Sequence, residues 1–242
     1  QLKERQLAGI GLTAPEFAVL LAYQKIRLAE ELITSDLPDD PFLRGVLQDY
    51  FPIALQERFP AQIDAHPLRR QIITTAMVNG LVNLAGITFM YRLREETGAS
   101  AADVTRAHVV AHEVYAMQAH WDAIEALDNQ VPAQVQTHMR LEGRRLVERA
   151  VRWLLHNRRS PIDMAAEIVA FRAGVAEVIG LLAKTLRGVD LAGFEQRRDE
   201  LTGAGVPAEL AVSVAGMTAA YSALGIVEVA TDAGVDVAQV AE

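Results

Sequence analysis

The sequence predicts an all-α protein, an irregular bundle of many helices without a Rossmann unit. Segment after segment repeats apolar residues at the three- and four-residue spacing of a helix. The alternation of strands and helices that a parallel sheet requires is absent from the pattern. Of the 242 residues, 51% are hydrophobic and 22% are charged, which is typical of a globular protein and not of a disordered chain.

The first long helix is expected to begin at Thr13. Thr13 can cap it, Pro15 suits an early helical position, and Glu16 completes a capping box. Apolar side chains then cover nearly the whole circumference of its first turns: Phe17, Val19, Leu20, Leu21 and Ile26. A helix that is apolar all round is normally buried, so we expect a central core helix. Prolines and aspartates at 35–41 should end it.

Short helices should follow through Pro52 and Pro60. A stronger helix is expected from about residue 67 to residue 84, and Gly86 should break it. Its inward side chains are predicted to be Ile72, Ile73, Ala76, Met77 and Val82. Residues 87–93 have strand propensity but lead directly into charged residues at helical spacing, which favours a helix.

In the second half of the chain, Ser100 and Asp103 form another capping-box pattern, which opens a helix. A shorter helix should surround Trp121, and Pro132 should start the longest helix of the chain.

Residues 161–186 predict a further helix. After it come a looser, glycine-containing stretch over 188–205 and a pair of helices built from small residues. We therefore expect a main helical bundle over residues 1–187 and a small, truncated helical segment over residues 188–242.

Charge and composition exclude several classes of function. A net charge of −8 disfavours nucleic-acid binding, because phosphate contacts need a concentrated basic surface. The longest strongly apolar stretch, 17–23, is far too short for the ~20 residues that span a bilayer, so no membrane contact is expected. The absence of cysteine excludes thiolate metal sites and, without an export signal, suggests the cytoplasm. Gln1 and Glu242 both interrupt helical patterns, so we interpret the sequence as a piece of a longer polypeptide.

Two stretches match the dinucleotide-binding pattern G-x-G-x-x-A: Gly9-Gly11-Ala14 and Gly203-Gly205-Ala208. The pattern binds a pyrophosphate only where a strand leads into the glycine turn and a helix follows. The residues before both stretches are charged and helical in pattern, so we expect helix-joining turns and no NAD site in this chain.

No metal site is predicted either. His108 and His112 lie four residues apart, as two zinc ligands can, but Val109 stands where a zinc protease needs its glutamate. His120 follows two turns later, and we expect all three imidazoles to face solvent. Prolines interrupt a single acidic cluster, for which we expect turn and capping roles: Asp36, Asp39 and Asp40.

Arginines give the long helix a basic surface: Arg140, Arg144, Arg145, Arg149, Arg152, Arg158 and Arg159. Glu148 can pair with Arg144 and Arg152 at four-residue spacing, which favours a salt-bridged, solvated or interdomain face. The alternative is a carboxylate-binding or interface site at Arg144, Arg145, Arg149 and Arg152, because guanidinium groups bind carboxylates in bidentate fashion.

A second polar cluster comprises Asn79, Asn83 and Thr88. Buried amides need hydrogen-bond partners, so these side chains are expected to bond the neighbouring backbone and fix the turn at Gly86. A polar ligand pocket is the alternative.

Six stretches, taken in order, resemble one protein family. They are GLTAPEFAVLLAYQKI (11–26), SDLPDDPFL (35–43), YFPIALQERF (50–59), HPLRRQIITTAMVNGLVNLAGITFMYRLREETGAS (66–100), LDNQVPAQVQTHM (127–139) and LEGRRLVERAVRWLLHNRRSPIDMA (141–165). Together they resemble the C-terminal helical region of the large-subunit, NAD-specific bacterial glutamate dehydrogenases. The resemblance fades after about residue 187.

The resemblance implies that the chain is a part of such an enzyme that carries none of its catalytic residues. In that family the substrate-binding lysines and the Rossmann domain precede this region, so no catalytic or NAD-binding role is transferred to any position here. The parent enzyme would convert L-glutamate and NAD to 2-oxoglutarate, ammonia and NADH. The chain is expected to pack on its own catalytic domain and to contribute to a homo-oligomer. Two alternatives are an amino-acid-binding regulatory module and a scaffold that docks a regulatory protein.

Overall fold

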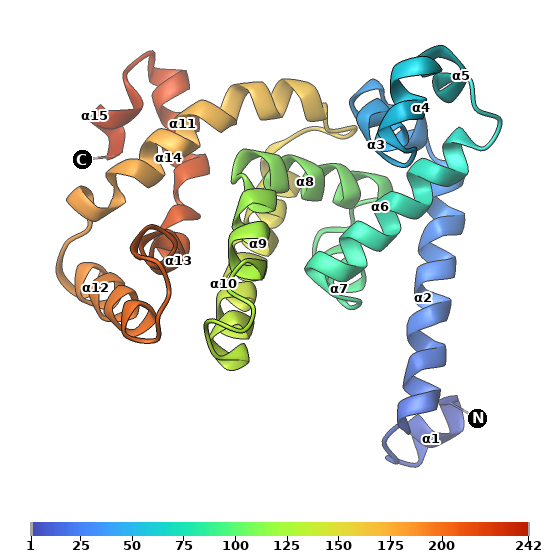
Figure 1. The fold of residues 1–242 in the computed structure, drawn as a ribbon, viewed down its shortest axis with the longest axis horizontal. Helices are drawn as coiled ribbons and strands as arrows, with labels where there is room; N and C mark the ends of the chain where they lie inside the picture. Colours follow the sequence, from blue (N-terminus) through green and yellow to red (C-terminus); the bar gives the residue numbers. More distant parts are fainter. Residues whose placement is uncertain (1, 242) are drawn as a thin grey trace. The chain divides into compact units, whose positions relative to one another are not determined.

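The computed structural model describes residues 2–241, and no strand occurs among them. The prediction of an all-α fold without a Rossmann unit is confirmed (Figure 1). The chain divides into two compact units, residues 1–105 and residues 106–242, which we call the N-terminal unit and the C-terminal unit. The domain boundary expected between residues 187 and 188 stays a prediction.

The N-terminal unit is built from short helices around two longer ones. Its elements are α1 (Leu2–Leu7), α2 (Ala14–Thr34), the 3₁₀ helices η1 (Leu37–Asp39) and η2 (Pro41–Leu43), α3 (Arg44–Asp49), α4 (Ile53–Arg58), α5 (Pro60–Asp64), α6 (Arg69–Ala85) and α7 (Phe89–Thr97). Helix α8 (Ala101–Val114) begins in this unit and ends in the next.

The C-terminal unit contains the longest helix. Its elements after α8 are α9 (Met117–Glu125), α10 (Ala133–Asn157), α11 (Met164–Thr185), α12 (Gly188–Gly203), α13 (Ala208–Ala220), α14 (Ala223–Ala233) and α15 (Val237–Ala241).

Local signals place the helix ends where the sequence predicts them. The Glu16 carboxylate accepts hydrogen bonds from the Thr13 backbone N–H at 2.9 Å and from the Thr13 hydroxyl at 2.7 Å. At the start of α8, the Asp103 backbone N–H donates to the Ser100 hydroxyl oxygen at 3.0 Å, and that hydroxyl donates to the Asp103 carboxylate. Gly86 ends α6 with a φ of 93°, a conformation that favours glycine.

The expectation that α2 is a central core helix is wrong for its first half. Phe17 and Val19 in that half, and Ile26 just beyond it, are about half exposed, at 48%, 49% and 50%. Only the second half of the helix is buried, through Leu28 and Leu32, where α2 packs along α6. Figure 1 shows the first turns of α2 standing clear of α3, α4 and α5, so the unit supplies too few neighbours to cover them.

Helix α6 turns a different face inward from the one predicted. Ile73 is buried as expected, but the rest of the buried face is Thr74, Val78 and Leu81. The predicted side chains of Ile72 and Val82 are half-buried. Because the helix is apolar on several sides, its sequence pattern alone does not select the buried stripe.

The core of the C-terminal unit lies along α10. Four residues of the predicted stripe are buried, namely Met139, Leu146, Ala150 and Leu154, while Trp153 is half-buried. Helix α13 packs on α10, α11 and α12, and α14 packs on α11.

The expectation of a loose stretch from residue 188 onward is wrong. Residues 188–203 form the regular helix α12, and Phe194 and Leu201 on it are buried. Burial of these two side chains against neighbouring helices stabilises a helix that its glycines alone disfavour.

No single helix within residues 2–241 is both long and apolar enough to cross a membrane. Two helix pairs, α6 with α7 and α13 with α14, reach that length and composition only when joined across bends of 90° and 65°.

Candidate functional site

An apolar groove lies on the surface of the N-terminal unit. It has a volume of about 330 Å³ and lies between α2, α6 and α7. Its apolar lining is Leu20, Tyr23, Leu28, Val82, Ile87, Met90 and Tyr91. The volume is at the lower limit of the usual range for ligand pockets, and the walls offer mainly van der Waals contact.

Charged and polar groups border this groove. Arg94 of α7 forms an ion pair with Glu31 of α2, with 2.8 Å between Nη1 and Oε2, and so ties the two walls together. Arg27 also lines the groove. The Gln24 Oε1 atom is shielded from solvent and has no hydrogen-bond partner within residues 2–241. An acceptor in that state costs free energy until a donor reaches it.

The exposed apolar surface continues beyond the groove. Tyr23 and Tyr91 at its edges are each 62% exposed, and Phe17 and Ile26 of α2 are each about half exposed. Most of the large apolar side chains that the chain exposes belong to the N-terminal unit. Contiguous apolar surface of this kind marks interaction sites in folded proteins. We call the groove together with Phe17, Val19 and Ile26 the α2 surface.

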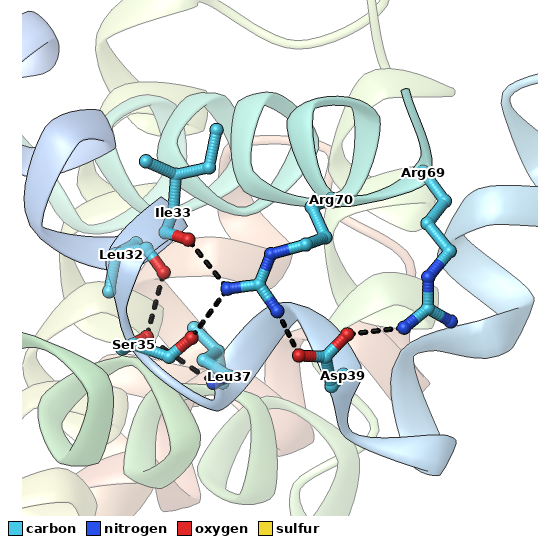
Figure 2. A network of polar contacts seen from close by, with 7 residues as sticks. All are labelled: Leu32, Ile33, Ser35, Leu37, Asp39, Arg69 and Arg70. Carbon is cyan, nitrogen blue, oxygen red and sulfur yellow. Dashed lines mark hydrogen bonds and ion pairs between the residues drawn. The ribbon is translucent and has the colours of Figure 1, made fainter. Parts of the chain in front are cut away.

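A polar network fixes α2 on α6 at the other end of the helix. Figure 2 shows Arg70 of α6 donating to the main-chain carbonyls of Ile33 at 2.6 Å and Ser35 at 2.8 Å. The same guanidinium, together with that of Arg69, forms ion pairs with Asp39. These bonds satisfy carbonyls that the end of a helix leaves unpaired, and so hold the second half of α2 in place.

The acidic cluster therefore plays two different roles. Asp40 caps η2, accepting a hydrogen bond from the Phe42 backbone N–H at 2.9 Å, as predicted. Asp39 instead serves as an ion-pair partner of two arginines, a role that the sequence analysis missed. The partners lie 30 and 31 residues away, and no spacing rule connects them.

The polar cluster expected near Gly86 is not buried. Asn79, Asn83 and Thr88 are all exposed, so the premise of buried amides is wrong. The Asn79 side-chain oxygen accepts a hydrogen bond from Lys25 Nζ at 3.1 Å, which links α6 to α2. None of the three residues lines the groove.

The structure pairs part of the arginine surface with carboxylates of the same helix. Arg152 binds Glu148 at 2.6 Å, one of the two pairs predicted at this spacing. Arg145 binds the buried Glu142 at 2.6 Å, while Arg149 is exposed and Arg144 half-buried. A carboxylate or interface role for Arg144, Arg145, Arg149 and Arg152 stays a prediction.

One member of the arginine surface has a structural role that the sequence analysis missed. Arg158 binds Glu167 at 2.8 Å and Glu228 at 2.7 Å, which connects the end of α10 to α11 and α14. Its guanidinium also lies over the rings of Trp153 and Phe171, at 4.8 Å and 5.0 Å from their centroids. None of these contacts has the three- or four-residue spacing by which a helix brings side chains together, so no sequence signal pointed to them.

The three histidines are not solvent-facing, which corrects the prediction. His108 and His120 are buried, and burial lowers the pKa of His108 to about 3 and that of His120 to about 4. His112 is half-buried and accepts a hydrogen bond from the Trp121 indole N–H at 3.2 Å. Desolvation disfavours the charged imidazole, so all three are neutral at physiological pH.

The two glycine patterns join helices. Gly9 and Gly11 lie between α1 and α2, and Gly205 lies between α12 and α13. No strand precedes either turn within residues 2–241, so the geometry of a dinucleotide-binding turn is not formed there. Within the same range no three His, Asp or Glu side chains are grouped as metal ligands.

Comparison with known proteins gives a consistent result along the chain. Residues 9–242 match the model of the family described as "Glutamate dehydrogenase, C-terminal". A protein of Halomonas elongata named NAD-specific glutamate dehydrogenase is 40% identical over 230 residues, or 95% of this chain. Proteins of the same name from Mycobacterium tuberculosis and Pseudomonas aeruginosa are 39% and 40% identical over all 242 residues. The chain spans only 14–15% of the length of these curated relatives.

Proposed function

The chain belongs to the family of glutamate dehydrogenase C-terminal regions, and from this premise we propose that it is a non-catalytic helical domain of an NAD-dependent glutamate dehydrogenase. The parent polypeptide would oxidise L-glutamate to 2-oxoglutarate and ammonia, with NAD as the hydride acceptor. Residues outside this chain would bind both substrates and carry out the chemistry.

The observation that carries the proposal is the α2 surface. A stable globular domain normally buries a helix as apolar as the first half of α2, because exposed apolar area costs about 25 cal/mol per Å². Here that half is exposed, while the second half is anchored on α6. Such a helix suits a domain whose role is to bind other protein surface, which supports a structural role within the parent enzyme.

The test compares this chain with the full-length polypeptide. Purified full-length protein should reduce NAD when L-glutamate is added, and it should lose this activity when glutamate is omitted. The isolated chain, at the same molar concentration, should give no NADH above the buffer rate. Glutamate-dependent NAD reduction by the isolated chain would contradict the non-catalytic role, and no activity in the full-length protein would contradict the parent reaction.

A further inference from the structure

We propose that the α2 surface docks into an apolar recess on the catalytic region of the same polypeptide. The inference deepens the proposed function, on which it rests, by naming the surface and its partner. The partner's chemistry follows from the surface: apolar side chains that enter the groove and surround Tyr23, a hydrogen-bond donor within reach of Gln24, and a carboxylate near Arg27.

The angular spread of the exposed residues sets the shape of the partner. At 100° per residue, Phe17, Leu20, Tyr23, Val19 and Ile26 occupy about half of the helix circumference. All five are at least 36% exposed. A single helix packed against α2 covers only a narrow seam. Covering half of the circumference requires a concave partner surface made from several elements.

The width of the exposed apolar face of α2 favours the catalytic region, and not a second copy of the chain, as the partner. A symmetric pair of α2 helices would bury one seam and leave Phe17 or Ile26, on opposite edges of the exposed half, in water. The rest of the polypeptide, which would include the catalytic region, offers much more surface, because this chain makes up only 14–15% of the curated relatives' length. The anchoring of α2 by Arg70 presents the helix in a fixed direction, which lowers the ordering cost of docking.

The Gln24 amide adds a polar requirement to the apolar recess. Its Oε1 atom is an acceptor held out of water, and the terminal torsion of a glutamine side chain turns readily toward a new donor. A donor on the partner would therefore relieve an unpaired acceptor as well as gain a hydrogen bond. An entirely apolar partner would leave that cost in place.

Cysteine labelling of the full-length enzyme tests the docking. The chain has no cysteine of its own, so Tyr23→Cys introduces one reporter on α2. Gln71→Cys, an exposed polar position on α6 of the same unit, is the matched control. Maleimide labelling of each peptide is followed by mass spectrometry, and each rate is normalised to the same variant in urea. We expect labelling of the α2 reporter to slow by about tenfold or more, and that of the control by less than about threefold.

A photocrosslinker at position 23 of the full-length protein identifies the occupant. Crosslinks from position 23 to peptides of the catalytic region, with slow labelling of Tyr23→Cys, would support the proposal. Crosslinks to α2 of a second copy would overturn it in favour of a symmetric interface, and labelling as fast as the control would overturn docking altogether. Glutamate-dependent NAD reduction is measured on the same preparations. A protected α2 in a protein without that activity would refute the proposed function and leave the docking intact.

Discussion

Gly143, in the middle of α10, is the position where a single methyl group most directly tests the packing of the C-terminal unit. A Cβ atom added there would lie 2.5 Å from Trp121 Cη2 and 2.9 Å from Met117 Cε, both on α9. Carbon atoms in contact normally lie about 3.5–4.0 Å apart, so the indole ring would have to move by about 1 Å. The ring is not free to do so, because its N–H donates to His112.

The magnitude follows from two opposing effects of Gly143→Ala. Alanine in a helix interior is favoured over glycine by about 1 kcal/mol. Overpacking of a well-filled core costs about 1–3 kcal/mol, and weakening the Trp121–His112 hydrogen bond adds about 0.5–1.5 kcal/mol. We expect a net loss of about 1–2 kcal/mol in the free energy of unfolding.

Gly180→Ala in α11 is the matched control, since apart from the helix's own nearby backbone no neighbouring group lies within 4 Å of the added methyl group. This substitution should raise the free energy of unfolding by about 0.5–1 kcal/mol through helix propensity alone. Tryptophan fluorescence during urea unfolding measures both variants, because Trp121 and Trp153 are the only two tryptophans and both lie in the C-terminal unit. If Gly143→Ala is as stable as the parent chain or more so, the close approach of α9 and α10 is refuted.

Three further predictions concern buried charge and protonation. The free energy of unfolding should be level above about pH 7 and fall from pH 6.5 toward 4, because unfolded imidazoles bind protons that the buried ones exclude. The fall should reach up to about 1.4 kcal/mol per pH unit for each buried histidine. Urea titrations at several pH values should show a shallower fall for His120→Phe. Arg158→Ala should lower the free energy of unfolding by about 2–3 kcal/mol, because it leaves Glu167 and Glu228 without their partner. The control Arg159→Ala, at an exposed neighbouring position, should change the free energy of unfolding by less than about 0.5 kcal/mol. Equal effects of the two substitutions would exclude the bridging role of Arg158. Arg70→Ala should lower the free energy of unfolding by about 1–3 kcal/mol and Arg69→Ala by less than about 1 kcal/mol, because only Arg70 also binds the end of α2. Circular dichroism during thermal unfolding measures both variants. The reverse order of stability would contradict the network in Figure 2.

The position of the helices was largely predictable from the sequence because local bonds fix their ends. The capping pairs Thr13–Glu16 and Ser100–Asp103 join residues three apart, and both form as expected. Prolines and Gly86 act through their own backbone torsions, which no distant contact has to supply. The family resemblance came from six longer stretches of sequence in the same order.

Tertiary structure decided which apolar and which titratable side chains are buried. The pattern of α2 is that of a core helix, yet its first half is exposed because only its second half meets α6. The pattern of α8 suggests solvent-facing histidines, yet His108 is buried. Periodicity assigns residues to faces of a helix, but the neighbours that cover a face come from distant parts of the chain.

The candidate surface depends on the same long-range contacts. The ion pair that joins the groove walls links Glu31 to Arg94, residues 63 apart. In the C-terminal unit, the ion pair between Arg158 and Glu228 likewise joins residues 70 apart. The sequence by itself determined most of the helices and their ends, because those depend on residues a few positions apart, and six stretches in order indicated the family. Only the folded chain decided where an apolar surface stays open, because burial is a property of what packs against a residue and not of the residue itself.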